Sequence, residues 1–176
     1  MSDLLTREEY GAIAKGLTLP VNAFIDGSFR PAHSGATFET VNPATGTKLA
    51  DVASCDAKDV DFAVEKARDA FEDGRWSRLH PSARKDVLIR LCKLLTRNAH
   101  ELAVMESLDS GKPLGEAEGD VGGAARAFEY YAAAANALQG ESFPLGHDYL
   151  GYSQPEPVGI TTSASRPSTT RAHTCC

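Results

Sequence analysis

The chain has 176 residues, which is enough for one domain with a hydrophobic core. Hydrophobic residues make up 42% and charged residues 24%, an ordinary balance for a globular protein. The net charge of −6 argues against nucleic acid as a partner, because nucleic-acid binding requires a basic face. No stretch approaches the roughly 18 apolar residues of a membrane span, so no membrane partner is expected. The lead segment 1–19 is acidic early and lacks the apolar core of a secretory signal, so the expected compartment is the cytoplasm.

The cysteines do not indicate a metal centre or a reactive thiol. No pair among Cys55, Cys92, Cys175 and Cys176 has the spacing of zinc ligands, and none lies in a Cys/His cluster. Cys92 lies beside the apolar face of a predicted helix and is interpreted as a small buried hydrophobe. The alternative, a nucleophile at Cys92, is disfavoured because a packed helix hides the thiol from a substrate.

The first part of the chain predicts a short amphipathic helix over 4–15 and then two pairs of short strands. The first pair occupies 22–31, around the tight-turn dipeptide Asp26-Gly27. The second pair occupies 36–41 and 48–53, and alternating residues in its first strand indicate a half-exposed sheet. Together these strands predict an antiparallel β-meander.

Three amphipathic helices are predicted after the strands. The first covers 57–72, with Asp56 as its N-cap. The second and longest runs from Pro81 to Gly111, where glycine favours a left-handed cap, and Asn98 is expected to bend or divide it. Its apolar stripe predicts a core helix and consists of Leu88, Leu91, Leu95, Leu102, Met105 and Leu108. The third helix covers about 114–138.

The last part of the chain is predicted to be extended and then unstructured. Residues 140–160 contain a strand-like stretch at Tyr149–Ser153. Residues 161–176 are rich in Ser and Thr and have no apolar period, which is typical of a disordered tail.

Several motifs, in order, resemble the aldehyde dehydrogenase superfamily. They are Phe24-Ile-Asp-Gly, Phe38-Glu-Thr-Val-Asn-Pro-Ala-Thr-Gly46, the helix from Asp59 to Phe71, Glu106-Ser-Leu-Asp-Ser-Gly-Lys-Pro113, Tyr130-Tyr-Ala132 and Glu156-Pro-Val-Gly-Ile160. The resemblance covers about residues 20–160. It implies the N-terminal part of an α/β fold: a β-meander with helices over 20–139, and an oligomerisation arm over 140–160 that leads into a missing cofactor domain.

The resemblance also implies a function for the intact protein. The family oxidises an aldehyde to a carboxylic acid with NAD or NADP, by thiolate attack, hydride transfer and hydrolysis of the thioester. The nearest branch acts on aminoaldehydes such as γ-glutamylaminobutyraldehyde or betaine aldehyde. The family's catalytic Cys and Glu and its cofactor loop lie beyond Cys176. No catalytic or cofactor-binding residue can therefore be named here, and this chain alone is expected to be inactive and to bind no NAD(P).

The 161–176 tail departs abruptly from the family pattern, and a frameshift explains the departure. Reading the last base of each codon with the first two of the next permits His-Leu-Gly-Ile-Ala-Pro-Phe-Asn-Tyr-Pro over Thr161–Arg171. That residue sequence resembles the family motif expected at this position, and the family motif also carries the oxyanion-binding Asn. An out-of-frame tail is therefore the preferred interpretation.

One binding site transfers with the resemblance. Some family members hold a monovalent cation such as K⁺ with main-chain oxygens of the Thr-Val/Ile-Asn-Pro strand and the Asp of the Leu-Asp-Thr-Gly-Lys turn. The matching residues are Thr40, Val41 and Asp109. The alternative is that Asp109 only hydrogen-bonds the neighbouring turn.

Two further functions remain open from the sequence. The chain could act as an interaction module that binds intact subunits of a homo-oligomer through the arm, at residues 149–158. It could also be a product that folds poorly, since helices that lack their covering domain expose apolar patches.

Overall fold

A computed structural model describes residues 5–144, 146–148, 150–156 and 159–160. It contains five helices and three short two-stranded sheets in this part of the chain. The predicted disordered tail at 161–176 lies outside the described residues, as do Tyr149, Pro157 and Val158 of the predicted arm.

Both predicted strand pairs form antiparallel hairpins. Strands β1 (Ala23–Ile25) and β2 (Ser28–Arg30) are joined by Asp26 and Gly27, both with positive φ (53° and 73°). Two left-handed residues of this kind match the twist of a tight hairpin. Strands β3 (Thr37–Val41) and β4 (Lys48–Ala53) pair from Thr37↔Ala53 to Val41↔Lys48, with a register shift between Thr40 and Val41.

The prediction of one continuous β-meander is wrong. The two hairpins form separate sheets, because the chain leaves β2 at Pro31, which has no N–H to donate, and then turns at Ala32–Gly35. One backbone bond connects the second hairpin to the segment before β1, from Ala53 N to Val21 O at 2.8 Å.

The described residues form five helices where four were predicted, one before the strands and three after them. Helix α1 (Arg7–Gly16) begins with a capping box made by Thr6 and Glu9, and α2 (Ala57–Glu72) begins with one made by Asp56 and Asp59. The longest predicted helix is two helices, α3 (Pro81–Arg97) and α4 (Ala99–Ser110). Helix α5 (Leu114–Ala134) ends before the predicted residue 138.

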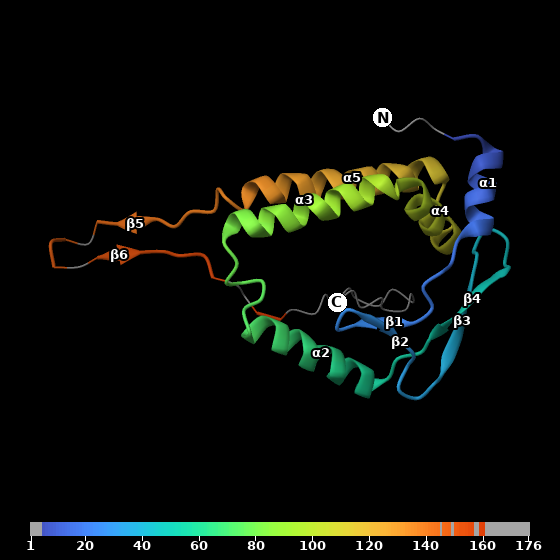
Figure 1. Cartoon of the computed structure of the whole chain (residues 1–176), viewed down its shortest axis with the longest axis horizontal. Helices are drawn as coiled ribbons and strands as arrows, with labels where there is room; N and C mark the ends of the chain where they lie inside the picture. The colour runs from blue at the N-terminus through green and yellow to red at the C-terminus, as the bar shows by residue number, and fades with distance from the viewer. Residues whose placement is uncertain (1–4, 145, 149, 157–158, 161–176) are drawn as a thin grey trace.

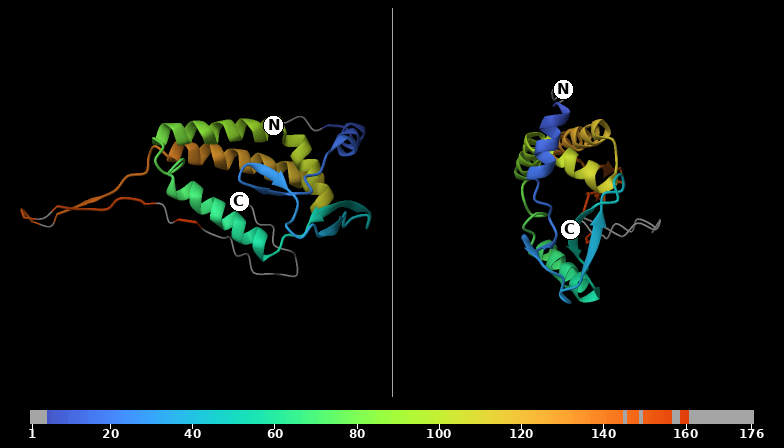
Figure 2. Two further views of the ribbon diagram at one scale, coloured as in Figure 1. Left: turned by 60° about the horizontal axis from the view of Figure 1, so that its bottom comes forward. Right: turned by 90° about the vertical axis from the view of Figure 1, so that its right-hand side faces the viewer.

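Asn98 was expected to bend or divide the long helix, and it divides it into α3 and α4. Its side-chain amide and its backbone N–H both donate to Leu94 O, and its φ and ψ (−103° and 20°) are not helical. Asn forms such local side-chain bonds readily, which is why it favours helix ends. Helices α3 and α5 pack side by side, while α4 packs on α5 and α1 on α4 (Figures 1 and 2).

A third hairpin projects away from the helices at one end of the molecule (Figure 1). It pairs β5 (Ser142–Phe143) with β6 (Gly151–Tyr152), and Ser153 N donates to Glu141 O at 2.8 Å. The predicted strand at Tyr149–Ser153 is therefore present in part, and it has a partner strand that the sequence did not indicate.

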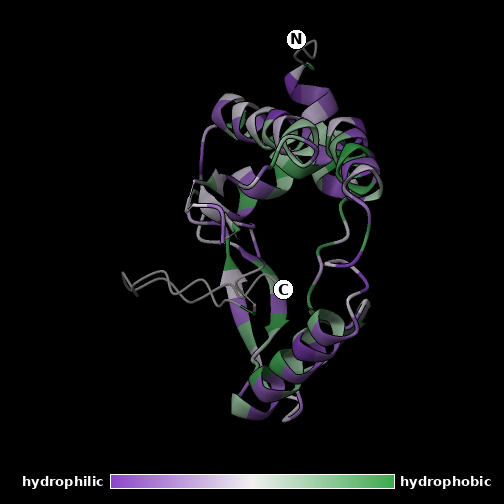
Figure 3. Cartoon of the chain, turned by 90° about the vertical axis from the view of Figure 1, so that its left-hand side faces the viewer, coloured by the Kyte–Doolittle hydropathy of each residue, from purple (hydrophilic) through white to green (hydrophobic). Residues whose placement is uncertain are grey.

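The hydrophobic core of the described chain is thin. Its buried apolar residues are mostly small: Ile25, Ala32, Ala103, Val104, Ala117, Ala125 and Ala132. Helix α3 has no fully buried residue, and Leu91 of the predicted core stripe is 36% exposed. Hydrophobic and hydrophilic residues alternate along the helices (Figure 3). No helix among the described residues is long and apolar enough to span a membrane.

Candidate functional site

The turn between β3 and β4 is built around Asn42, a residue 9% exposed. The Asn42 side chain accepts from Ala44 N at 2.9 Å, and its carbonyl accepts from Gly46 N at 2.7 Å. Its own N–H donates to Thr47 O at 2.8 Å. The sequence Asn-Pro-Ala-Thr-Gly therefore encodes a fixed turn, because Asn supplies local bonds and Gly46 supplies a positive φ of 71°.

The turn between α4 and α5 meets that hairpin turn directly. Gly111 ends α4 in the left-handed conformation (φ 74°), as predicted, and its N–H donates to Ser107 O. A Cβ atom at Gly111 would lie 2.7 Å from Pro43 Cγ. The contact fits only glycine, and it brings two of the family-like motifs together, Phe38–Gly46 and Glu106–Pro113.

Two of the three residues predicted to bind a cation meet at this corner, although the contact uses the Thr40 hydroxyl and not the predicted main-chain oxygen. Thr40 Oγ1 donates to Asp109 Oδ1 at 3.2 Å, across 69 residues of sequence. Val41 follows Thr40 at the register shift of β3. The alternative, in which Asp109 only hydrogen-bonds the neighbouring turn, stays open beside this bond to β3.

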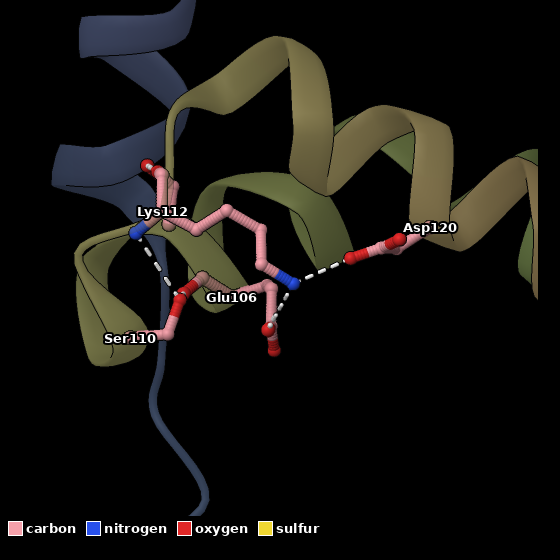
Figure 4. A network of polar contacts seen from close by, with 5 residues as sticks. Glu106, Ser110, Lys112 and Asp120 are labelled. Carbon is pink, nitrogen blue, oxygen red and sulfur yellow. Dashed lines mark hydrogen bonds and ion pairs between the residues drawn. The ribbon is translucent and has the colours of Figure 1, made fainter.

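A cationic network that the sequence did not reveal stabilises the same turn. Lys112 Nζ pairs with Glu106 Oε1 at 3.2 Å and with Asp120, and its backbone N–H donates to Ser110 Oγ (Figure 4). Its carbonyl accepts from Ser107 Oγ at 2.8 Å. The hydrogen bonds that Lys112 Nζ donates to Asp120 and Glu106 raise the pKa of Lys112, so its ammonium stays charged. The ion pairs link the end of α4 to the second turn of α5.

The available oxygens fit a monovalent cation better than a divalent one. Carboxylate, hydroxyl and carbonyl oxygens are hard donors, but Glu106 and Asp120 are paired with Lys112, which leaves the Asp109 carboxylate, where Ca²⁺ sites draw on several. In the described part of the chain, no group of three or more His, Cys, Asp or Glu residues could hold a metal ion.

The described cysteines do not have the features of an activated nucleophile. Cys55 is exposed, but desolvation and the carboxylates of Asp59 and Asp56 raise the pKa of its thiol. A catalytic thiol needs a lowered pKa, which nearby positive charge or a helix N-terminus provides. Cys55 therefore lacks the activation that a nucleophilic thiol needs.

Comparison with protein families identifies the fold to which these motifs belong. The model of the aldehyde dehydrogenase family matches residues 29–165. The chain belongs to the aldehyde dehydrogenase family. Both motifs that form the corner lie inside the matched range, which confirms the resemblance inferred from them.

Curated aldehyde dehydrogenases are similar over most of this chain but are much longer. Aminoacetaldehyde dehydrogenase of Pseudomonas aeruginosa is 49% identical over 161 residues, which are 91% of this chain and 32% of that protein. The NADP/NAD-dependent aldehyde dehydrogenase PuuC of Escherichia coli is 40% identical, over 84% of this chain and 30% of its own length. This chain thus spans about a third of the curated relatives that it matches.

Solved aldehyde dehydrogenases share the fold. Indole-3-acetaldehyde dehydrogenase AldA of P. syringae, solved with NAD⁺ and IAA, superposes with a TM-score of 0.85 at 46% identity, covering 89% of this chain and 32% of that one. The γ-glutamyl-γ-aminobutyraldehyde dehydrogenase of Burkholderia cenocepacia has a TM-score of 0.79 at 44% identity, covering 81% and 29%. Aldehyde dehydrogenase is an oxidoreductase family, and this chain corresponds to one part of its fold.

Proposed function

We propose that this chain supplies the N-terminal part of an NAD(P)-dependent aldehyde dehydrogenase that oxidises a small aminoaldehyde to the carboxylic acid. The identity of 49% to aminoacetaldehyde dehydrogenase over nearly the whole chain supports this proposal most directly. Within that enzyme, the chain holds two family motifs together at Gly111 and Pro43 and projects the hairpin of β5 and β6. The chain alone carries no oxidation step and binds no dinucleotide.

The test of this proposal is reconstitution. The 176-residue chain is co-expressed with the remaining two-thirds of a related aminoaldehyde dehydrogenase, and NADH formation from aminoacetaldehyde is measured. We expect activity from the pair and none from either part alone. Activity of the 176-residue chain by itself would contradict the proposal, and so would failure of the pair to assemble.

A second candidate function is binding to intact subunits through the arm. The hairpin exposes large apolar side chains, with Phe143 44%, Leu150 84% and Tyr152 66% exposed. Short strands with unpaired edges and apolar side chains are suited to pairing with another chain. Co-purification of a tagged full-length homologue should fall when Phe143 and Tyr152 are both changed to Ser. Unchanged co-purification would exclude the arm as the contact.

The cation site is a third part of the proposal. Asp109 Oδ1 lies 3.2 Å from Thr40 Oγ1, which brings the carboxylate to the strand whose main-chain oxygens, at Thr40 and Val41, would be the other ligands of K⁺. We expect K⁺ to raise the melting temperature of the chain more than tetramethylammonium does at equal ionic strength. Asp109→Asn should remove that difference, whereas Asp61→Asn on exposed α2 should keep it. Equal effects of both salts on the unmodified chain would mean general screening and no site.

We also propose that residues 161–176 are read out of frame. The support is that the shifted frame permits Pro-Phe-Asn-Tyr-Pro where the family motif is expected. Resequencing the coding DNA from the codon for Pro157 onward should reveal a single-base change that opens this frame into a cofactor domain. A coding sequence whose third bases cannot spell the motif would disprove the proposal.

A further inference from the structure

The end of β2 and the first turns of α2 border a pocket of about 410 Å³. Its walls come from three segments of the chain: the end of β2, the loop that follows it, and α2. The residues that line it are Arg30, Pro31, His33, Lys58, Asp59 and Phe62. We call this cavity the β2–α2 pocket. It combines cationic side chains with an apolar wall, and it lies apart from the corner formed by Thr40 and Asp109.

The Asp59 carboxylate holds the two sides of the pocket together. Its Oδ1 accepts from His33 N at 2.9 Å, and its Oδ2 accepts from Asp56 N at 2.9 Å. These bonds, the one from Asp56 first, lower the pKa of Asp59, so the carboxylate is ionised. Each oxygen already accepts a backbone hydrogen bond, and the residue is 9% exposed. Asp59 therefore fixes the shape of the pocket, and its charge is met by backbone donors.

Arg30 brings a guanidinium group without a polar partner to this pocket. Its Nε is buried and forms no hydrogen bond within the described part of the chain. The salt bridges among the described residues do not include Arg30. Its Cζ lies 4.7 Å from the centroid of the Phe62 ring, and this cation–π contact holds the group in place. Buried donors without partners are rare in folded proteins, so the Nε–H points to an acceptor that this chain does not itself supply.

Lys58 adds a second positive charge that no carboxylate of the described residues pairs with. Nearby charges of both signs are already engaged. The Asp56 carboxylate accepts from backbone N–H groups in the first turn of α2. Lys66, the other cation near the aromatic ring, pairs with Glu65 and Asp69. The unpaired charge at the pocket is therefore positive, which favours an anion as its ligand.

We propose that the β2–α2 pocket binds a small organic carboxylate, with the charged end on Arg30 and the apolar body against Phe62 and Pro31. The forked N–H groups of a guanidinium match the two oxygens of a carboxylate, and Lys58 contributes a point charge. The volume favours an organic molecule over a bare anion. Pockets of about 300–1,000 Å³ hold small organic ligands, whereas inorganic phosphate would leave the apolar wall of this pocket uncovered.

Titration of the full 176-residue chain with the probe 3-phenylpropionate tests the site. The backbone amide signals of His33 and Lys58 are followed by nuclear magnetic resonance at constant ionic strength and pH 7. We expect saturable shifts with a dissociation constant on the order of 1 mM, and binding of the neutral 3-phenylpropionamide that is at least about tenfold weaker. Inorganic phosphate should also bind more weakly than the carboxylate. The readout is binding, so it does not depend on aldehyde oxidation.

Three results of this titration would overturn the proposal. Equal binding of the carboxylate and the amide would mean that charge plays no part. Tighter binding of phosphate would mean that the apolar wall plays no part. The absence of saturable shifts at His33 and Lys58 up to about 20 mM probe, well above the expected dissociation constant, would mean that there is no site.

Three matched variants assign the binding to the pocket. Arg30→Gln removes the guanidinium and should weaken binding of 3-phenylpropionate about tenfold. Lys58→Gln changes an exposed side chain and should weaken it about threefold with the fold intact, so it remains informative if Arg30→Gln disturbs the hairpin. Arg90→Gln, an exposed position on α3, is the control and should bind as the unmodified chain does. Unchanged binding in both pocket variants, or equal weakening in Arg90→Gln, would disprove the assignment.

Discussion

Gly111 lets two distant motifs come into contact, because it has no side chain and adopts a left-handed backbone conformation. Its φ of 74° disfavours any side chain, and a Cβ atom there would collide with Pro43 Cγ at 2.7 Å. We therefore expect Gly111→Ala to lower the free energy of unfolding by about 1–3 kcal/mol, through backbone strain and overpacking together. Urea denaturation measures the change.

Gly115, four residues later, provides the control for that experiment. It lies in the first turn of α5, and a Cβ atom there would meet nothing within 4 Å. Gly115→Ala should be neutral or stabilise by up to about 1 kcal/mol, because alanine favours the helix. If both variants destabilise equally, the contact with Pro43 is not the cause.

Asp59 makes stability depend on pH in the acidic range. Its carboxylate accepts from the backbone N–H groups of Asp56 and His33, and these bonds hold the pKa of Asp59 below its usual value. The folded state therefore prefers the ionised form. Its contribution is complete above the ordinary Asp range near 4 and is lost as the pH falls through the lowered pKa. Asp59→Asn should flatten thermal stability between pH 5 and 3, whereas Asp61→Asn should not.

Residue-level features whose signal is local could be predicted from the sequence. The cap at Asp56, the turn at Asp26-Gly27 and the end of α4 at Gly111 each depend on neighbours a few residues away. The pairs formed by Lys112 and by Glu118 were missed. Many charged residues could satisfy the same spacing, and only the packing of α4 on α5 selects among them.

At the scale of elements, the positions of strands and helices were predictable and their pairing was not. Side chains that alternate in polarity every second residue predicted β3, and apolar residues that recur with the helical period predicted α3 and α5. Whether β2 pairs with β3 depends instead on the path of the chain after Pro31, which hydrophobic pattern does not encode. The meeting of Thr40 with Asp109 could be anticipated through the family resemblance alone.

The arm hairpin depends on a single glycine at its base. A Cβ atom at Gly140 would lie 1.8 Å from Ser153 O, inside the pair that closes the hairpin. Gly140→Ala should therefore open β5 and β6 and raise amide exchange over 141–153, while α3 and α5 keep their protection. Gly122→Ala on α5, where the nearest added contact is 3.5 Å, should not affect the arm.

At the scale of the whole molecule, the described chain leaves many large apolar side chains uncovered. They include Val60, Trp76, Leu94, Tyr130 and Leu138, which are 44–71% exposed, while no large side chain is fully buried. Surfaces of this kind mark contacts with further protein. We expect the isolated chain to bind the dye ANS strongly, and co-expression with the remaining part of an aldehyde dehydrogenase to reduce that binding severalfold. Weak binding by the isolated chain would mean that it covers these residues itself.

The hydrogen bond between Tyr10 of α1 and Glu118 of α5 also has a consequence for synthesis on the ribosome, because the two residues are far apart in the sequence. Tyr10 is made early, but its partner Glu118 follows 108 residues later. At ordinary translation rates that interval lasts roughly 5–20 s, far longer than a helix needs to form and melt. Helix α1 therefore waits as an unattached nascent segment while the hairpins and α2, α3 and α4 emerge. Its docking marks the point at which the first and the later parts of this chain become one cooperative unit.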